Sequence, residues 1–259
     1  MEFLNLIKNE FILDIKKLKD SKISFLTDIT IFTTVLFVTL VTGLDSSFSN
    51  FYGIDIKQGK MLVIIGFIFW QISTTALGWS SQNIRRQSLS GTLELKLQSK
   101  FSLELLTFIE MSTYLFISFL SFFIIFIVFI IAIGGSFSDI LYVLLSYIIS
   151  IPALFGMYGI GLLLGGISLK EKLIGNFVYI IQTALAFISD LSGEKSRIFN
   201  IIPFNAGIKI MRGIYLGENI PLNLVFDYFI VNIIWLTIGI IIFRKLLKQV
   251  RRNGSFSNY

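Results

Sequence analysis

Four carboxylates lie in or beside long apolar segments, and their placement decides whether the chain could support chemistry inside a membrane. They are Asp28, Glu110, Asp190 and Asp227. Charged residues at such depth are costly and often mark catalytic pairs or ion pathways. The three aspartates, however, fall at the ends of predicted spans, with Asp28 on the opposite side from the other two. The sequence therefore predicts no catalytic pair and no enzyme.

The chain offers few side chains that could bind a metal ion or act in catalysis, because it contains no histidine and no cysteine. This removes the commonest metal ligand, all thiolates and the usual general base near neutral pH. The nearest approach to a phosphate-binding loop runs from Gly53 to Lys60. It has one residue too many between its glycines, and Met61 replaces the Ser or Thr that would bind Mg²⁺. We expect no nucleotide, metal or cofactor site in this chain.

The elements that carry these residues are predicted to be membrane spans. The 259 residues are 54% apolar and only 15% charged, and the mean hydropathy is +0.80. An ordinary soluble domain has roughly 25% charged residues. The net charge of +6 does not indicate nucleic-acid binding, because the basic residues flank apolar runs. The composition predicts an integral membrane protein.

Six segments are apolar enough to be predicted as crossings, and together they form a transmembrane domain over 25–243. Each is continuously apolar, which favours helices over the alternating pattern of barrel strands. Pro152 predicts a kink in the fourth segment, which is longer than a straight crossing needs. The fold class is thus an all-α integral membrane protein, with predicted spans at 25–44, 61–80, 105–134, 140–169, 173–189 and 225–243.

The distribution of lysine and arginine predicts the orientation of the chain. They concentrate before the first span, in the loops 81–104 and 170–172, and in a basic tail over 244–259. The positive-inside rule places these segments, and both termini, in the cytoplasm. The first apolar run follows a long segment of mixed charge and exceeds the length of a signal-peptide core. We therefore expect a multi-pass protein of the inner or plasma membrane.

Residues 1–24 are predicted to form an amphipathic helix along the cytoplasmic membrane surface. Leu4, Ile7, Phe11, Ile15 and Leu18 recur at helical spacing, and lysines occupy much of the remaining surface. The alternative is a basic flank that only sets topology.

The cytoplasmic loop 81–104 is predicted to contain a second amphipathic helix. Leu89, Leu93, Leu97 and Phe101 repeat every four residues, with Glu94 beside the stripe. This face either meets a soluble partner or folds back on the bundle.

The outer segment 190–227 is unusually apolar for a loop. Pro203 suits a helix start and Gly217 a C-terminal cap, which predicts a short helix over 203–216. Such a helix either dips into the outer leaflet between spans or packs on the rim of the bundle.

Three further features of the spans allow two interpretations each. Glu110 could gate a pathway or bind a cationic substrate, or it could pair with a nearby base. The glycines of the fourth span could form an interface between chains or pack internally. The phenylalanines of the third span, including Phe119 and Phe122, suit an apolar cargo or simple lipid contact.

The order of these elements resembles the permease subunits of type-2 ABC exporters. The most similar stretch is Ser90-Gly91-Thr92-Leu93-Glu94-Leu95, followed by Ser99 and by Leu103-Glu104-Leu105. A second similarity is the series Pro203, Arg212 and Gly217 in the outer segment. The proline that commonly follows the serine in this family is replaced here by Lys100. In element order the resemblance covers nearly the whole chain.

The resemblance implies a transport subunit whose ATP and Mg²⁺ are bound by a partner. Two copies of an ABC ATP-binding subunit would dock on a coupling helix that includes Leu89, Gly91, Thr92, Leu93, Glu94 and Leu97. The N-terminal helix would extend that docking surface, and a pair of re-entrant helices around Pro203, Arg212 and Gly217 would cap the pathway. A second permease chain, identical or homologous, would complete an exporter for a hydrophobic or amphipathic cargo such as a drug, toxin, peptide or lipid-like molecule. The alternative is a channel or membrane scaffold without ATP coupling.

Overall fold

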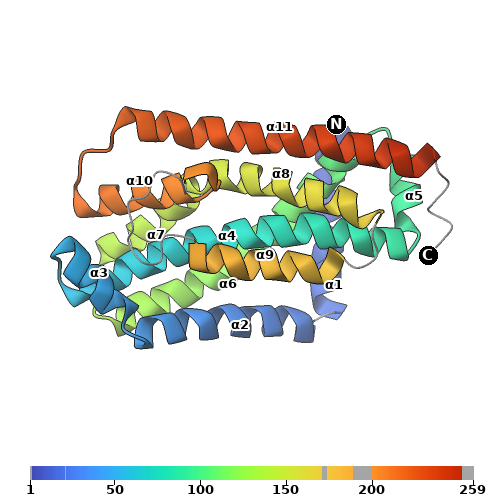
Figure 1. The fold of residues 1–259 in the computed structure, drawn as a ribbon. Helices are drawn as coiled ribbons and strands as arrows, with labels where there is room; N and C mark the ends of the chain where they lie inside the picture. The colour runs from blue at the N-terminus through green and yellow to red at the C-terminus, as the bar shows by residue number, and fades with distance from the viewer. Residues whose placement is uncertain (1, 21, 171–173, 189–199, 253–259) are drawn as a thin grey trace.

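The computed structural model describes residues 2–20, 22–170, 174–188 and 200–252 as an all-helical chain. The candidate Asp190, the first part of the predicted outer segment and residues 253–259 of the basic tail lie outside the described residues. Figure 1 shows the long helices side by side along one axis, with α1 lying across them. The helices are α1 (Glu2–Asp20), α2 (Lys22–Val41), α3 (Leu44–Tyr52), α4 (Ile56–Leu89), α5 (Thr92–Leu97), α6 (Leu103–Ala132), α7 (Phe137–Ile149), α8 (Ile151–Ser168), α9 (Ile174–Ile188), α10 (Asn205–Leu216) and α11 (Leu222–Arg252).

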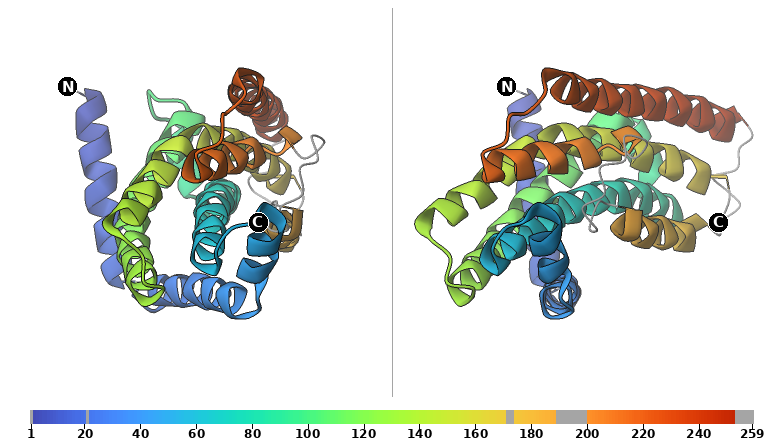
Figure 2. Two further views of the ribbon diagram at one scale, coloured as in Figure 1. Left: turned by 90° about the vertical axis from the view of Figure 1, so that its left-hand side faces the viewer. Right: turned by 60° about the vertical axis from the view of Figure 1, so that its left-hand side comes forward.

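Helix α4 forms the centre of the bundle, and the other long helices surround it (Figure 2, left). In the most apolar 18-residue stretch of α4, 89% of the residues are buried, whereas the corresponding shares are 22% in α6 and 17% in α11. The faces of α6 and α11 that the bundle leaves uncovered are rich in Phe, Ile, Leu and Val. So much exposed apolar surface is unfavourable in water but is suited to contact with lipid.

Among the helices of the described residues, four are long and apolar enough to cross a membrane, namely α4, α6, α8 and α11. The pair α2 and α3, bent by 56°, raises this number to five if it is one span. Helix α9, which covers the predicted fifth span, has 15 residues, fewer than the roughly 20 that a perpendicular crossing takes. The described residues are thus all-helical and agree with a membrane protein, and four to five of the six predicted crossings meet the length criterion.

Two helices continue beyond the ends of their predicted spans, and for the same reason. Helix α4 continues past the predicted end at residue 80 to Leu89, and α11 continues through the predicted tail to Arg252. In both cases the helix continues from the apolar run into the polar sequence that follows it. Apolar length reports the lipid-facing part of a helix and not the end of its hydrogen-bond ladder.

The predicted fourth span is divided into α7 and α8 at Ser150, close to the predicted kink at Pro152. Proline lacks the N–H that would continue the helix. The Tyr228 hydroxyl of α11 lies at the break, where it donates to the Ile149 carbonyl at 2.7 Å and accepts from the Ala153 amide at 3.2 Å. One side chain of α11 therefore satisfies two backbone groups that the kink separates.

The glycines of α8 mediate packing within this chain. A Cβ atom on Gly159 would lie 2.4 Å from the Trp235 carbonyl oxygen of α11, and one on Gly161 would lie 2.8 Å from the Leu77 carbonyl oxygen of α4. Distances this short leave room for no side chain, so the three backbones approach each other only because these positions are glycine. Of the two interpretations of the glycines, internal packing is the observed one.

The predicted N-terminal helix is present as α1. Ile7 and Phe11 of its predicted apolar face pack on α6, with the Phe11 and Phe116 rings 6.2 Å apart, while Leu4 of the same face is 70% exposed. Asp14, which is buried, accepts a hydrogen bond from the Thr113 hydroxyl of α6. A polar contact that the hydrophobic pattern did not predict therefore also holds α1 against α6.

Candidate functional site

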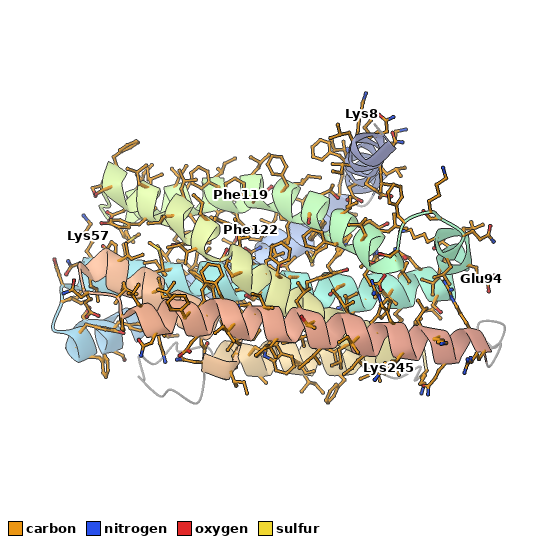
Figure 3. The ribbon with its side chains drawn as sticks, turned by 90° about the horizontal axis from the view of Figure 1, so that it is seen from above. Lys8, Lys57, Glu94, Phe119, Phe122 and Lys245 are labelled. Carbon is orange, nitrogen blue, oxygen red and sulfur yellow. The ribbon has the colours of Figure 1, made fainter. Side chains whose placement is uncertain are left out.

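Charged residues distinguish the two ends of the bundle. We call the end that carries Arg85, Arg86, Arg244, Lys245, Arg251 and Arg252 the basic end. Figure 3 shows Glu94 and Lys245 together at this end and Lys57 at the opposite end. The sequence expectations that concern coupling all fall at the basic end.

The predicted coupling helix is shorter than the leucine spacing indicates. Leu89 is the last residue of α4, Gly91 turns the chain with a φ of +71°, and α5 then covers only six residues. A single helix over 89–101 is therefore a wrong prediction. The left-handed backbone at Gly91, which glycine adopts without strain, separates Leu89 from the other leucines.

The leucines of this loop point in two directions. Leu93 is fully buried and Leu97 is half-buried, and both pack on the core that α4 and α8 share. Leu89 and Leu95 are 57% and 68% exposed, and the side chain of Glu94 is exposed between them. Packing on the bundle is therefore observed for Leu93 and Leu97, while contact of the exposed residues with a soluble partner stays a prediction.

A buried carboxylate connects α5 to α6 and α4. Glu110 of α6 is 3% exposed and accepts hydrogen bonds from Asn83 at 2.6 Å and from Gln87 at 2.9 Å, both on α4. Its other oxygen is bonded to the Lys96 ammonium of α5. Pairing with a nearby base is therefore the observed arrangement of Glu110. A role in gating or in binding a cation stays a prediction.

A second carboxylate joins the start of α6 to the end of α11. The side chain of Glu104 forms an ion pair with Arg244, and its backbone carbonyl accepts a hydrogen bond from the Tyr158 hydroxyl of α8. Sequence reasoning missed the roles of Lys96, Glu104 and Arg244. The sequence shows that these charged residues lie next to apolar spans, but their spacing does not indicate which acidic side chain pairs with which basic one.

At the opposite end, the predicted outer helix is present as α10. It ends at Gly217, whose φ of +71° matches the predicted C-terminal cap. Pro203 lies just before the helix, where its carbonyl accepts a hydrogen bond from Asn232 of α11 at 3.0 Å. Trp235 donates to the Ile201 carbonyl at 2.8 Å. The start of α10 is therefore fixed to the middle of α11.

Arg212 is the most deeply buried cation of this helix, with 2% exposure. Its guanidinium lies 4.5 Å from the centre of the Phe48 ring, and its Nε donates to the Leu62 carbonyl at 3.2 Å. A planar guanidinium can stack on an aromatic face while its N–H groups donate in fixed directions, whereas a compact ammonium cannot make both contacts at once in this geometry. Arg212 thereby joins α10 to α3 and α4.

An open cavity of about 550 Å³ lies beside Arg212 between α10 and the start of α11. Its wall carries both signs of charge, with Lys209 and Arg212 on α10 and Glu218 and Asp227 nearby. Lys209 donates to the Asn200 side chain at 2.9 Å. The cavity therefore brings charged side chains of both signs together beside α10.

The Gly53–Lys60 stretch connects α3 to α4. Gly53 ends α3, and Asp55 and Gln58 form a capping box that starts α4. Within the described residues, no group of three or more acidic side chains could hold a metal ion.

Comparison of the sequence with known protein families finds no matching family model, and comparison with curated proteins finds no similar sequence. The class that fold and composition define is a helical membrane protein with one basic end.

Proposed function

We propose that this chain is the permease subunit of an ATP-driven exporter of the type-2 ABC class. The observation that carries the proposal is the exposed face of α5 at the basic end, held to α4 and α6 through Lys96 and Glu110. A partner that pushes on Glu94 and Leu95 would transmit the displacement to both long helices. A loop that was only a connection would need no buried ion pair behind it.

Six crossings follow if α2, α4, α6, the α7–α8 pair, α9 and α11 each count as one. The start of α2 and the end of α11 then share the basic end, in agreement with a cytoplasmic location of both termini. In this arrangement α1 lies along the cytoplasmic membrane surface, because it crosses the long helices instead of joining them. The inner or plasma membrane is the proposed location.

The outer segment suits a re-entrant element. Asn232 and Trp235, which bind the segment before α10, lie about 15–20 Å from the start of α11 at the rise of an α-helix. A helix that begins at this depth and ends at Gly217 returns to the surface from within the outer leaflet. This supports a cap over the outer end of a pathway.

Two such permeases, identical or homologous, with two ABC ATP-binding subunits would form the complete exporter. The partner ATPases would bind ATP and Mg²⁺, while this chain supplies the path for a hydrophobic or amphipathic cargo. A channel is less well supported, because polar side chains of α4 and α9 bond to the backbone of the neighbouring helix. Trp70 donates to the Gln182 backbone carbonyl at 3.4 Å, and the Gln182 side chain donates to the Thr74 backbone carbonyl at 2.7 Å.

Co-purification and a charge reversal test this proposal. The tagged chain should recover a protein with a nucleotide-binding P-loop, and Glu94→Lys should lower ATP-driven flux in vesicles at least tenfold. Lys100→Glu, a charge reversal elsewhere in the same exposed loop, is the matched control for nonspecific effects. Recovery of the chain without an ATPase, together with ATP-independent flux, would favour the channel instead.

A further inference from the structure

A cavity of about 600 Å³ lies between α6 and the kinked pair α7 and α8. Gln71 and Ile72 of the central helix α4 contribute to its wall and are 2% and 5% exposed. Most of the remaining wall is apolar and includes Leu115, Phe116, Phe119, Ile148, Ile151 and Leu154. The volume falls within the usual range for small-molecule sites.

Two polar groups in this wall have no hydrogen-bond partner within the described part of the chain. They are the Gln71 side-chain oxygen and the Tyr147 hydroxyl, and both atoms are buried. Buried polar atoms are usually bonded, and other unbonded ones, such as those of Ser73 and Asn205, occur elsewhere in the bundle. Gln71 and Tyr147 are distinguished because both residues line the same cavity, where a ligand would supply the missing partner. A hydroxyl group on a bound molecule can both donate and accept hydrogen bonds. It can therefore bond to the Tyr147 hydroxyl, and to the Gln71 amide whether the amide oxygen or the amide nitrogen faces it.

The depth of Gln71 decides what kind of molecule can supply that hydroxyl. Lys57 and Arg85 lie equally far from it along α4, about 21 Å in each direction at the rise of an α-helix. Figure 3 likewise shows Phe119, from the opposite wall, between the end with Lys57 and the end with Glu94. Gln71 is therefore near the bilayer midplane, about 15 Å from either headgroup region.

A phospholipid cannot fill this cavity and satisfy Gln71 at the same time. Its polar atoms stay in the headgroup region, and only its hydrocarbon chains reach the midplane. A charged ligand is disfavoured too, because none of the residues that line the cavity carries a charge.

We propose that this cavity binds an uncharged amphiphile with a hydrocarbon body and a hydroxyl group, held at the bilayer midplane by Gln71 and Tyr147. If the chain is the exporter subunit proposed above, such a molecule represents its class of cargo. The lining residues Phe116, Ile148 and Ile151 are exposed on the outside of the bundle, so the ligand would enter the cavity from the hydrocarbon region.

Photolabelling of the purified chain in phosphatidylcholine nanodiscs tests the site without any ATPase. The probes are a long-chain alcohol with a diazirine in its chain, the methyl ether of the same alcohol, and phosphatidylcholine with the diazirine in an acyl chain. The alcohol should label peptides that contain residues 112–119 and 147–154 saturably, and it should bind more tightly than the ether.

Gln71→Leu and Tyr147→Phe should each weaken alcohol binding by about fivefold to tenfold, the effect of one lost hydrogen bond. Ether binding should weaken less than alcohol binding, because an ether oxygen still accepts a hydrogen bond but cannot donate one; retained ether binding also shows that the variants are folded. Tyr142→Phe, on α7 but outside the cavity wall, is the matched control and should bind like the original chain.

Equal affinity for alcohol and ether, or saturable occupation by the phosphatidylcholine probe, would overturn the proposal. Unchanged alcohol binding in both variants would also overturn it. The test is separable from the proposed function: ATP-driven flux without alcohol binding refutes only this site, and alcohol binding without ATP-driven flux refutes only the exporter.

Discussion

Replacing Lys96 with methionine should destabilise the basic end of the bundle, because it leaves the Glu110 carboxylate buried with only amide partners. Glu110 is 3% exposed, and Lys96 bonds to one of its two oxygens. Breaking a fully buried ion pair costs about 3–5 kcal/mol. The Lys96 side chain is 23% exposed, so we expect about 2–3 kcal/mol, near the strength of a hydrogen bond to a charged group.

A double-mutant cycle separates the pair from its surroundings. Glu110→Gln removes the charge but keeps a side chain that can bond to Asn83 and Gln87. Adding Lys96→Met to this variant should cost much less than in the original chain, which gives a coupling energy of about 1–3 kcal/mol. The assay is reversible denaturation in detergent, with unfolding monitored by circular dichroism.

Lys248→Met is the control, because Lys248 is an exposed lysine of α11 at the same end of the bundle; it should change stability by less than about 0.5 kcal/mol. Equal losses for Lys96→Met and Lys248→Met, or a coupling energy near zero, would refute the argument that the Lys96–Glu110 pair holds α5 to the bundle.

Three other substitutions test the packing of the spans by the same denaturation assay. Gly159→Ala should cost about 1–3 kcal/mol, because the new methyl group overlaps the α11 backbone; an unchanged midpoint would contradict this close approach. Tyr228→Phe should cost about 1–3 kcal/mol, since it removes the hydroxyl that bonds to both sides of the α7–α8 break; Tyr179→Phe, at an exposed tyrosine, should be nearly neutral. Arg212→Lys should lose about 1–3 kcal/mol, because an ammonium cannot reproduce both the stacking on Phe48 and the bond to α4; full stability would show that charge alone suffices there.

Sequence reasoning succeeded where one local rule decides the structure. Long apolar runs predicted the helical class and the centres of α4, α6 and α11, because insertion depends on summed hydrophobicity. The single residues Gly217 and Pro152 predicted a helix end and a kink, since each restricts the backbone by itself.

It failed where two distant segments decide the structure together. The leucine spacing of 89–101 predicted one helix, but the turn at Gly91 and the burial of Leu93 depend on how α5 meets the core. The pairing of Glu110 with Lys96, and of Glu104 with Arg244, depends on helices meeting at one end. Spacing along the chain does not contain that information.

The most direct test of the central claim is the sidedness of α5, and the chain suits it because it has no cysteine. Leu95→Cys should not react with a membrane-impermeant maleimide in intact cells and should react after permeabilisation. Asn219→Cys, at an exposed position just after the α10 cap, should react in intact cells. Labelling of Leu95→Cys from outside the intact cell would place α5 beyond the reach of any cytoplasmic ATPase and contradict the account.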